Sequence, residues 1–578
     1  MTAASLQPMI KPILLLTAAL FAPLIGISAA EPAPATPVAS GTLVVRLDGR
    51  FPLRPTGGLF FGGNEASLFD ATMLLHRALR EPEQRLVLDL SNGFSPGLVA
   101  AEELAAMLRS RGAGRKVACL VDNLEDQALV VAAACDEVVM VESGRLMVDG
   151  LAADSDYYAD ALNRFGIKFH AVTSGPAKTA PETLTQSGPS PTAIQEHEQL
   201  VHGLDRVLRE LGARGKIDAA ALKAVRAKAP QTPDIAMASG LVDATAEPGA
   251  WLMQQPAPIR HLKQERETPD LSTYAGLMTF WAELMQGERR TKHPRVVAVV
   301  ELEGTILDGD VSAPGYSICG NDTAALFDRL VGDGAVVAVV VRINSGGGSA
   351  DASDRMHFAL RRLSAVKPVV VLFDSVAASG GYYVGCAGRE IMVHRGTITG
   401  SIGVFAVVPD LEGTRALFGI KRHTIATDPR ADLFKSTGWG PEKEAGFRQV
   451  VAAVDARFQG IVAERRKLTA EKVHELAGGR VYTGDEAIAN GLADRLGDLP
   501  AAVARARELA GITEVLPLER LPRSGGLAAR LGLGGVSTSQ GVAALIPSAL
   551  PVELRFWWQI AQAQRLAVMA WAPGFGIR

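Results

Sequence analysis

The chain contains one structural unit twice, and this duplication constrains the architecture before any motif is considered. The strings FGIKFHAVTSGPAK and FGIKRHTIATDPRA begin at Phe165 and Phe418, which lie 253 residues apart. One pair of similar strings upstream and another downstream repeat at offsets of 252 and 251 residues. Three matches at nearly one offset predict two homologous domains of roughly 220 residues each, followed and preceded by additional segments.

The differences between the two copies point to chemistry. The second copy has Ser379 where the first has Gln127, and the first copy has Lys178 where the second has Ala431. A serine in one half and a lysine in the other predict an active site that is divided between the repeats.

Each copy alternates apolar runs of strand length with helical patterns. In the second copy the runs cover residues 296–304, 335–343 and 368–374, and residues 349–366 carry apolar positions at helical spacing. Continuous apolar runs indicate parallel strands that are buried on both faces. The predicted fold class is therefore α/β, with two tandem domains of mainly parallel sheets covered by helices.

Composition excludes some classes of function. A net charge of −3 over 578 residues gives no electrostatic footprint for nucleic acid. The four cysteines form no CxxC pair and no metal-ligand spacing, so they predict no metal site. A hydrophobic share of 48% suits surfaces that face other subunits or a membrane.

The first 30 residues have the composition of a targeting segment. Lys11 precedes an apolar run from Ile13 to Ile27, and small residues follow at 28–30. This pattern predicts either a cleaved signal peptide or an uncleaved membrane anchor, and both export the rest of the chain.

Near the C-terminal end, the pattern of residues 552–573 predicts an amphipathic helix that packs at a subunit interface or lies on a membrane surface.

Ser379 is the strongest candidate nucleophile. It follows a predicted strand that ends at Asp374, and Gly380 behind it offers a backbone N–H to a developing oxyanion. The glycine-rich loop 344–349 follows the preceding strand, so both loops open at the same edge of a parallel sheet. Gly347 or Gly348 of that loop could supply a second N–H.

A serine nucleophile needs a base, and none of the 10 histidines stands in a recognisable triad context. A lysine can serve when burial leaves its amine neutral. Lys178 lies in TSGPAKTAP, with no acidic residue nearby before Glu182. Lys178 is therefore the first candidate for the base and Lys435 the next.

Three strings carry a resemblance to a known family. AASGGYY begins at Ala377, TGSIGVF at Thr399 and GRVYTGDEAIANGLAD at Gly479. Together they resemble the signal peptide peptidase A family in its long duplicated form, called protease IV, over about residues 43–511. The resemblance implies a ClpP/crotonase-like fold and a Ser-Lys dyad, with the nucleophile in the second repeat and the base in the first.

The resemblance also implies residue roles. Ser379 would be the nucleophile and Lys178 the general base, while Ser401 would help to hold the lysine amine. Gly380 and Gly348 would donate to the oxyanion. Two positions depart from the family pattern, since the loop 344–349 lacks the usual proline and Lys178 lacks the usual preceding aromatic residue.

The implied function is that of an exported serine endopeptidase. Its expected substrates are cleaved signal peptides and other short apolar peptides, and its expected assembly is a homotetramer. The resemblance implies no metal and no other cofactor. The catalytic part would lie in the periplasm, either anchored in the inner membrane or released if the N-terminal segment is cleaved. The predicted segments are a targeting segment (1–30), a linker (31–42), the first repeat (43–250), a connection (251–294), the second repeat (295–511) and a C-terminal extension (512–578).

Two other functions remain open at this point. One is a non-catalytic peptide-binding scaffold of the same fold, and the other is a crotonase-like acyl-CoA enzyme.

Two local motifs are set aside. GFSPG around Ser95 resembles a nucleophile elbow, but Pro96 has no N–H for an oxyanion hole. His197 and His202 are five residues apart, whereas a zinc-binding helix needs a spacing of four.

Overall fold

The computed structural model describes most of both repeats. The described residues are 41–53, 66–112, 114–215, 217–228, 230–263, 293–309, 317–425, 427–428, 431, 438–522, 568–571 and 576–577. The predicted targeting segment, Lys435 and most of the predicted C-terminal extension lie outside this set. Among the helices of the described residues, none is both long enough and apolar enough to cross a bilayer.

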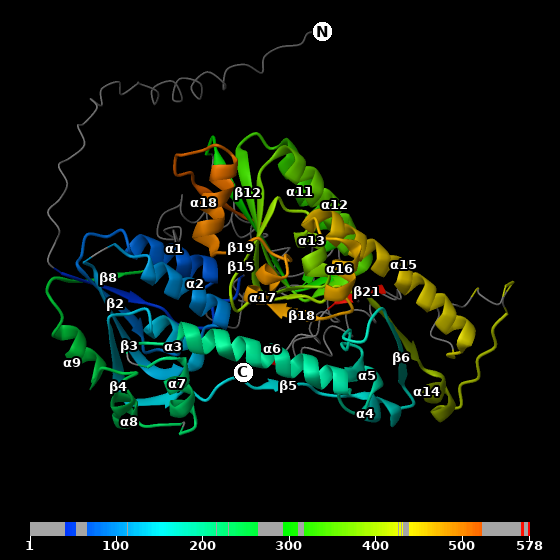
Figure 1. The fold of residues 1–578 in the computed structure, drawn as a ribbon, viewed down its shortest axis with the longest axis horizontal. Helices are drawn as coiled ribbons and strands as arrows, with labels where there is room; N and C mark the ends of the chain where they lie inside the picture. Colours follow the sequence, from blue (N-terminus) through cyan, green and yellow to red (C-terminus); the bar gives the residue numbers. More distant parts are fainter. Residues whose placement is uncertain are drawn as a thin grey trace, which may run out of the picture.

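The first repeat is built on a sheet of six parallel strands (Figure 1). In spatial order the strands are β7 (Ala244–Ala246), β4 (Glu137–Met147), β3 (Lys116–Glu125), β2 (Arg85–Leu90), β1 (Thr42–Arg46) and β8 (Ile259–Leu262). The helices of this repeat are α1 (Leu68–Ala78), α2 (Leu98–Arg109), α3 (Asp126–Ala132), α4 (Ala159–Asn163), α5 (Glu182–Thr185), α6 (Pro191–Leu211), α7 (Ala219–Arg226), α8 (Pro233–Ser239) and α9 (Pro248–Met253).

The second repeat has a corresponding sheet, which is parallel except at one edge. Its strands are β18 (Val481–Thr483), β16 (Ile398–Gly400), β14 (Val369–Ala378), β12 (Val336–Ser345), β9 (Val296–Glu303) and β20 (Leu518–Leu521), with β15 (Glu390–Val393) on β14 and β19 (Arg495–Leu496) on β15. Its helices are α11 (Gly320–Gly332), α12 (Ala350–Val366), α13 (Gly380–Gly385), α14 (Glu412–Leu417), α15 (Pro441–Arg466), α16 (Ala470–Leu476), α17 (Gly484–Ala489) and α18 (Leu499–Leu509). The predicted tandem of α/β domains is confirmed.

Both sheets extend further than the internal repeat suggested. β8 adds to β1 in the first sheet, and β20 adds to β9 in the second, each in parallel. These strands lie in segments that the sequence assigned to the connection and to the C-terminal extension. Each has only four residues and includes charged side chains, so no apolar run marks it.

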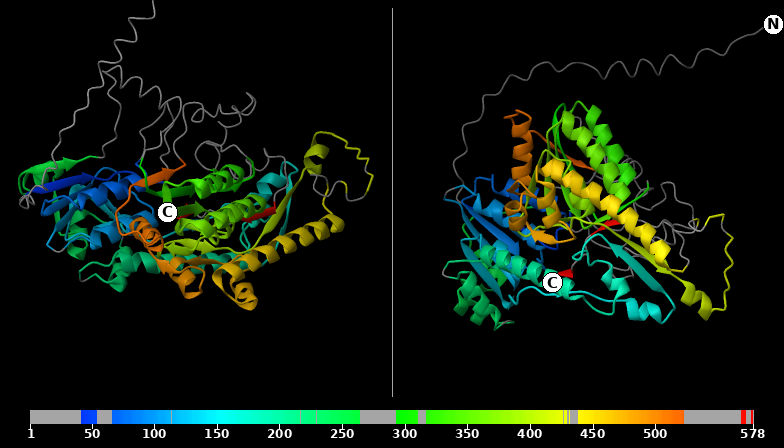
Figure 2. Two further views of the ribbon diagram at one scale, coloured as in Figure 1. Left: turned by 90° about the horizontal axis from the view of Figure 1, so that it is seen from above. Right: turned by 45° about the vertical axis from the view of Figure 1, so that its right-hand side comes forward.

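A third sheet joins the two repeats. Its order is β11 (Ser317–Cys319), β10 (Thr305–Leu307), β13 (Gly347–Ser349), β21 (Val568–Trp571), β17 (Phe405–Asp410) and β6 (Lys168–Thr173). β6 comes from the first repeat and β21 from the C-terminal end of the chain (Figure 2, red strand). The strand β21 corrects the prediction of one helix over residues 552–573, because pairing to two neighbouring strands overrides the local helical pattern.

The central strands are buried on both faces, as their continuous apolar runs predicted. In β9, Val296 and Val300 pack into a core on one face of the second sheet, whereas Val297 and Val299 pack into a smaller core on the other. Helices α11 and α12 lie over the first of these faces and α18 over the second (Figure 1). Burial of both faces restricts candidate sites to the ends of the strands, and sheets of this kind usually bind ligands at the carboxyl ends.

A buried ionic cluster connects α2 of the first repeat to the second sheet. Arg342 of β12 is fully buried and donates from Nη2 to Oε2 of Glu103 at 2.8 Å and from Nε to Oδ2 of Asp374 at 2.7 Å. His394 lies 3.4 Å from the same Glu103 carboxylate. Burial acts to raise the pKa of Glu103, but Arg342 and His394 outweigh it and hold that pKa at about 2.

Replacing Glu103 by glutamine tests this cluster. Glu103→Gln leaves the charge of Arg342 undercompensated, so the free energy of unfolding at pH 7 should fall by about 3 kcal/mol. Because the folded-state pKa is depressed from 4.5 to about 2, the difference from the wild type should shrink as pH falls through that range. Urea denaturation monitored by circular dichroism measures both effects.

The matched control is Arg362→Ala. Arg362 pairs with Asp328 on the surface, where both side chains are about half exposed, so its loss should cost less than about 1 kcal/mol. Equal losses in the two variants would contradict a special role for the buried cluster.

Candidate active site

Pairing of β6 with β17 carries Lys178 into the second repeat. The two strands are antiparallel, and their register runs from Thr173 opposite Phe405 to Lys168 opposite Asp410. The loop after β6 is then fixed by hydrogen bonds to the second repeat, since the Ser174 N–H donates to the Val404 carbonyl at 2.9 Å. The third sheet thus contains strands of both repeats, β6 and β17, and it lies where the loop after β6 contacts the residues just before β17.

The side chain of Lys178 ends among two serines. Its Nζ lies 2.8 Å from Ser379 Oγ, 2.8 Å from the carbonyl oxygen of Ser401 and 2.9 Å from Ser401 Oγ. The exposed fractions are 3% for Lys178, 0% for Ser379 and 1% for Ser401. The structure therefore brings together three of the residues that the sequence selected, and it shields them from solvent.

Ser379 occupies a strained turn between β14 and α13. Its φ of 52° and ψ of −115° lie in a region that non-glycine residues rarely adopt, at a cost of about 1–3 kcal/mol. Its N–H donates to the Gly400 carbonyl at 2.8 Å, which fixes the turn against the loop that carries Ser401. A nucleophile at a sharp strand-to-helix turn projects its hydroxyl away from the backbone.

Burial shapes the acid–base properties of the site. Desolvation lowers the pKa of Lys178 well below its ordinary value, while the charge of Asp455 on α15 acts in the opposite direction. Asp455 is also largely buried, and burial raises the pKa of its carboxyl group. Asp455 escaped the sequence analysis because no motif surrounds it and it is far from both Lys178 and Ser379 along the chain.

Both predicted oxyanion donors lie in elements next to this site, since β13, which holds Gly348, contacts α13. Gly380 opens α13 directly after Ser379, and Gly348 lies in β13 at a φ of 154°. A side chain at Gly348 would clash with the carbonyl of Ile306 in β10, so only glycine fits this close approach.

Gly479 forms part of the support for Lys178. Its N–H donates to the Ile402 carbonyl at 2.9 Å, and the Ala177 N–H donates to the Gly478 carbonyl at 3.0 Å. A Cβ at Gly479 would collide with the backbone nitrogen of Lys178. The lysine loop therefore packs directly on the glycine pair 478–479, a relation that sequence spacing alone does not reveal.

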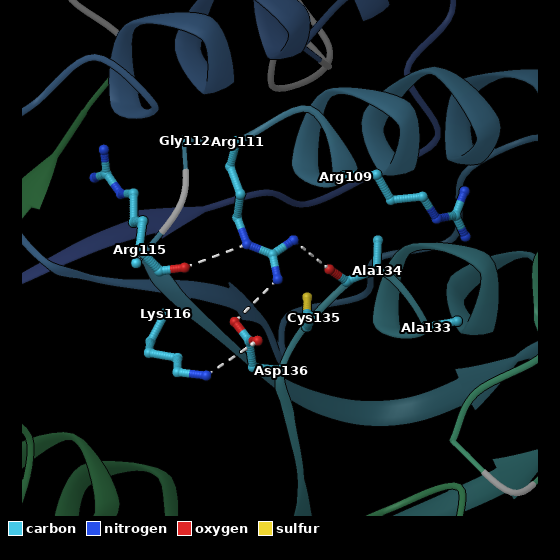
Figure 3. A pocket seen from close by; sticks show the side chains of 10 residues that line it. Arg109, Arg111, Gly112, Arg115, Lys116, Ala133, Ala134, Cys135 and Asp136 are labelled. Carbon is cyan, nitrogen blue, oxygen red and sulfur yellow. Dashed lines mark hydrogen bonds and ion pairs between the residues drawn. The ribbon is translucent and has the colours of Figure 1, made fainter.

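A separate basic pocket lies in the first repeat, near the end of α2. Its volume is about 490 Å³, and Figure 3 shows Arg111 and Lys116 pointing toward Asp136. Arg111 donates to the carbonyls of Leu108 and Ala134 as well as to Asp136. These contacts satisfy the ends of two helices, so the pocket has a structural explanation and is not part of the candidate active site.

A family model described as Peptidase family S49 matches residues 109–248 and 361–513, slightly more than half of the chain. The chain belongs to this peptidase family. The match falls in both repeats, in agreement with the long duplicated form that the sequence motifs resembled. The chain is a serine-type peptidase and therefore a hydrolase.

Two curated relatives cover most of the chain, and a third covers less than half of it. Protease 4 of Salmonella typhi is 28% identical over 82% of this chain and 78% of its own length. Protease 4 of Haemophilus influenzae is 27% identical over 77% of this chain and 73% of its own length. The chloroplastic serine protease SPPA of Arabidopsis thaliana is 31% identical over 42% of this chain and 36% of its own length.

Solved structures match part of the chain weakly. ClpP1 from Listeria monocytogenes is similar at a TM-score of 0.22 and 14% identity, over 35% of this chain and 91% of that protein. A mutant of a membrane-bound stomatin-specific protease reaches a TM-score of 0.24 and 15% identity, over 40% of this chain and all of that protein. Because these TM-scores are low, the fold class stands on the strand order described above.

The variant Gly479→Ala should strongly lower peptidase activity, although it changes neither the hydroxyls of Ser379 and Ser401 nor the amine of Lys178. Gly479→Ala forces the lysine loop away from Gly479 and so moves the Lys178 amine from Ser379, with an expected loss of about 10²-fold or more in kcat/KM. Hydrolysis of a short apolar peptide ester gives the measurement.

Gly478→Ala is the matched control. Gly478 has a positive φ of 77°, similar to the 96° of Gly479, but a Cβ there would meet only a Pro176 atom at 3.8 Å. Backbone strain is thus common to both variants and the clash is not. If both lose activity equally, the packing of Gly479 on Lys178 is not what positions the amine.

Proposed function

We propose that this chain is an exported serine endopeptidase that degrades cleaved signal peptides and other short apolar peptides with a Ser379–Lys178 dyad. The observation that carries the proposal is the environment of the Lys178 amine. A neutral amine has two hydrogens and one lone pair, and its three neighbours match them. The hydrogens can go to the carbonyl and hydroxyl oxygens of Ser401, which leaves the lone pair for the hydroxyl proton of Ser379.

The proposed reaction begins when Lys178 takes the proton of Ser379 Oγ as that oxygen attacks a peptide carbonyl. The backbone N–H groups of Gly380 and Gly348 would stabilise the oxyanion of the tetrahedral intermediate. The lysine would then give its proton to the leaving amine, and an acyl-enzyme would remain on Ser379. Water activated by the same amine would release the second product and restore the free hydroxyl.

Ser401 has a positioning role in this proposal. Its hydroxyl and carbonyl fix the direction of the lysine lone pair, and its own backbone is held at a φ of 48°. The Ser401 N–H donates to the Arg480 carbonyl at 2.6 Å, so this conformation is anchored next to Gly479. Such anchoring keeps the amine within reach of Ser379 in the absence of substrate.

The apolar substrate class, the periplasmic or inner-membrane location and the homotetramer belong to the same proposal. The N-terminal pattern around Ile13–Ile27 supports export. Exposed large apolar side chains support contact with other subunits or a membrane, and they include Phe165, Leu417, Phe418 and Ile420. The scaffold and acyl-CoA alternatives lack any observation that favours them, because neither needs a buried amine beside a strained serine.

Removal of either member of the dyad should stop hydrolysis while the fold persists. Ser379→Ala should lower kcat for a short apolar peptide ester by about 10⁴-fold or more. Lys178→Met, which keeps an apolar chain of similar length in the buried site, should lower it by about 10²- to 10⁴-fold. Full activity in Ser379→Ala, with an unchanged circular dichroism spectrum, would falsify the mechanism.

The pH profile should report the lysine. Activity requires the neutral amine, so kcat/KM should rise with pH through the depressed pKa of Lys178 and be lost below it. Asp455→Asn removes a charge that raises this pKa, so the acid limb should move to lower pH. Glu464→Gln, an exposed position on the same helix α15, should leave the limb in place. A limb that does not respond to Asp455→Asn would assign the titration to another group.

A further inference from the structure

A carboxylate of the first repeat binds the loop that leads to Ser401. Glu102 lies on α2, and its side chain is only 9% exposed. Its Oε1 accepts the Arg395 N–H at 2.8 Å, and its Oε2 accepts the Gly396 N–H at 3.0 Å. These two N–H groups belong to the loop between β15 and β16 of the second repeat. Both oxygens of one buried carboxylate therefore bind the backbone of the other repeat.

The chemistry of this contact suits a carboxylate. Consecutive backbone N–H groups that converge on one point form a binding site for a single anionic group. A carboxylate satisfies both donors with charge-assisted hydrogen bonds, whereas an apolar side chain would leave two buried N–H groups without a partner. The side chain of Glu102 thus holds the loop against α2 by two strong hydrogen bonds.

Other carboxylates of the first repeat contact side chains of the same loop. Glu103 lies 3.4 Å from the imidazole of His394, and Glu210 on α6 pairs with the guanidinium of Arg395. Asp485 of the second repeat also pairs with that guanidinium. Glu102 differs from these three residues because its partners are backbone N–H groups, so its contact fixes the course of the main chain.

The loop continues directly into the candidate dyad. It is followed by β16 (Ile398–Gly400), whose last carbonyl accepts the Ser379 N–H at 2.8 Å. The next residue, Ser401, contacts the Lys178 amine with its hydroxyl and its carbonyl. One short strand therefore joins the Glu102 contact to both members of the dyad.

A strand as short as β16 needs support at both of its ends. It pairs with β14 on one side and β18 on the other, but three paired residues contribute little stability by themselves. After the strand, the Ser401 N–H donates to the Arg480 carbonyl at 2.6 Å. Before the strand, Glu102 supplies the corresponding support, and it comes from the first repeat as Lys178 does.

We propose that Glu102 is a positioning residue for the Ser379–Lys178 dyad, because it fixes the loop before β16 and, through this strand, the partners of both groups. The inference rests on the proposed function. Glu102 acts through the loop and not on the reacting atoms. Its loss should therefore misplace the dyad and lower kcat, while substrate affinity stays nearly the same.

Two substitutions at Glu102 give graded effects on hydrolysis of a short apolar peptide ester. Glu102→Ala removes both acceptors, so kcat should fall by about 10²-fold while KM changes by less than about twofold. Glu102→Gln keeps one acceptor oxygen and should lose only about tenfold. An unchanged kcat in Glu102→Ala would overturn the proposal, and so would a rise in KM that accounts for the whole loss of kcat/KM.

The matched control is Leu104→Ala on the same helix. Leu104 is fully buried in the core of the first repeat, so its truncation leaves a cavity and should lower Tm at least as much as Glu102→Ala does. Its kcat per folded molecule should nevertheless stay within about twofold of the wild type. Equal losses of kcat in the two variants would assign the effect to stability and overturn the positioning role.

A second set of variants covers the case in which Glu102→Ala does not fold. A Cβ at Gly396 would meet Leu98 Cγ on α2 at 2.7 Å, so Gly396→Val forces the loop and the helix apart with Glu102 unchanged. This variant should lower kcat by about tenfold or more. Leu98→Ala in the same chain makes room for the valine and should restore kcat to within about threefold of Leu98→Ala alone. No recovery in the double variant would overturn the proposal.

Hydrogen exchange separates this inference from the proposed function, because it needs no substrate. Amide exchange in peptides that cover residues 395–402, measured by mass spectrometry, should be at least about tenfold faster in Glu102→Ala than in the wild type and unchanged in Leu104→Ala. Equal exchange in Glu102→Ala and the wild type would overturn the inference. Faster exchange in Glu102→Ala, with no hydrolysis even by the wild type, would instead sink the proposed function and leave only the support of the loop by Glu102.

Discussion

The antiparallel pairing of β6 with β17 is the constraint on which the candidate site depends. It takes the segment that leads to Lys178 out of the first repeat and fixes it against a strand of the second. Without that pairing, the 201 residues between the amine and Ser379 would leave no reason for the two groups to meet. The turn at Ser379, the loop of Ser401 and the glycine pair 478–479 all contact Lys178 or its loop, which this pairing places in the second repeat.

Much of this arrangement could be predicted from the sequence because the chain contains two copies of one unit, which can be compared with each other. Continuous apolar runs marked the strands that are buried on both faces, and they became β9, β12 and β14. Comparison of the two copies drew attention to Ser379 and Lys178, because neither residue is present at the matching position of the other copy. Both of these predictions depend on information that is local or repeated, which is the kind a single sequence contains.

Contacts between segments that lie far apart in the sequence, and that no repeated pattern marks, could not be predicted. Asp455 reaches Lys178 from α15, and Glu103 reaches Arg342 from the other repeat. Arg342 could be recognised in the sequence because it interrupts an apolar strand, and a buried cation needs a partner. The sequence did not indicate which carboxylate is that partner. The strand at 568–571 was also missed, because local periodicity there favours a helix and the pairing partners lie more than 160 residues away.

The division of the candidate dyad between the repeats has an evolutionary consequence. In the proposed dyad each copy supplies one of the two groups, so neither domain alone would hold a complete pair. Separation of the two halves by recombination or truncation would leave two inactive proteins. Under this proposal the two repeats must stay in one chain. Because the ribosome completes the repeat with Lys178 first, a new chain would cut no peptide until the repeat with Ser379 had also emerged and folded.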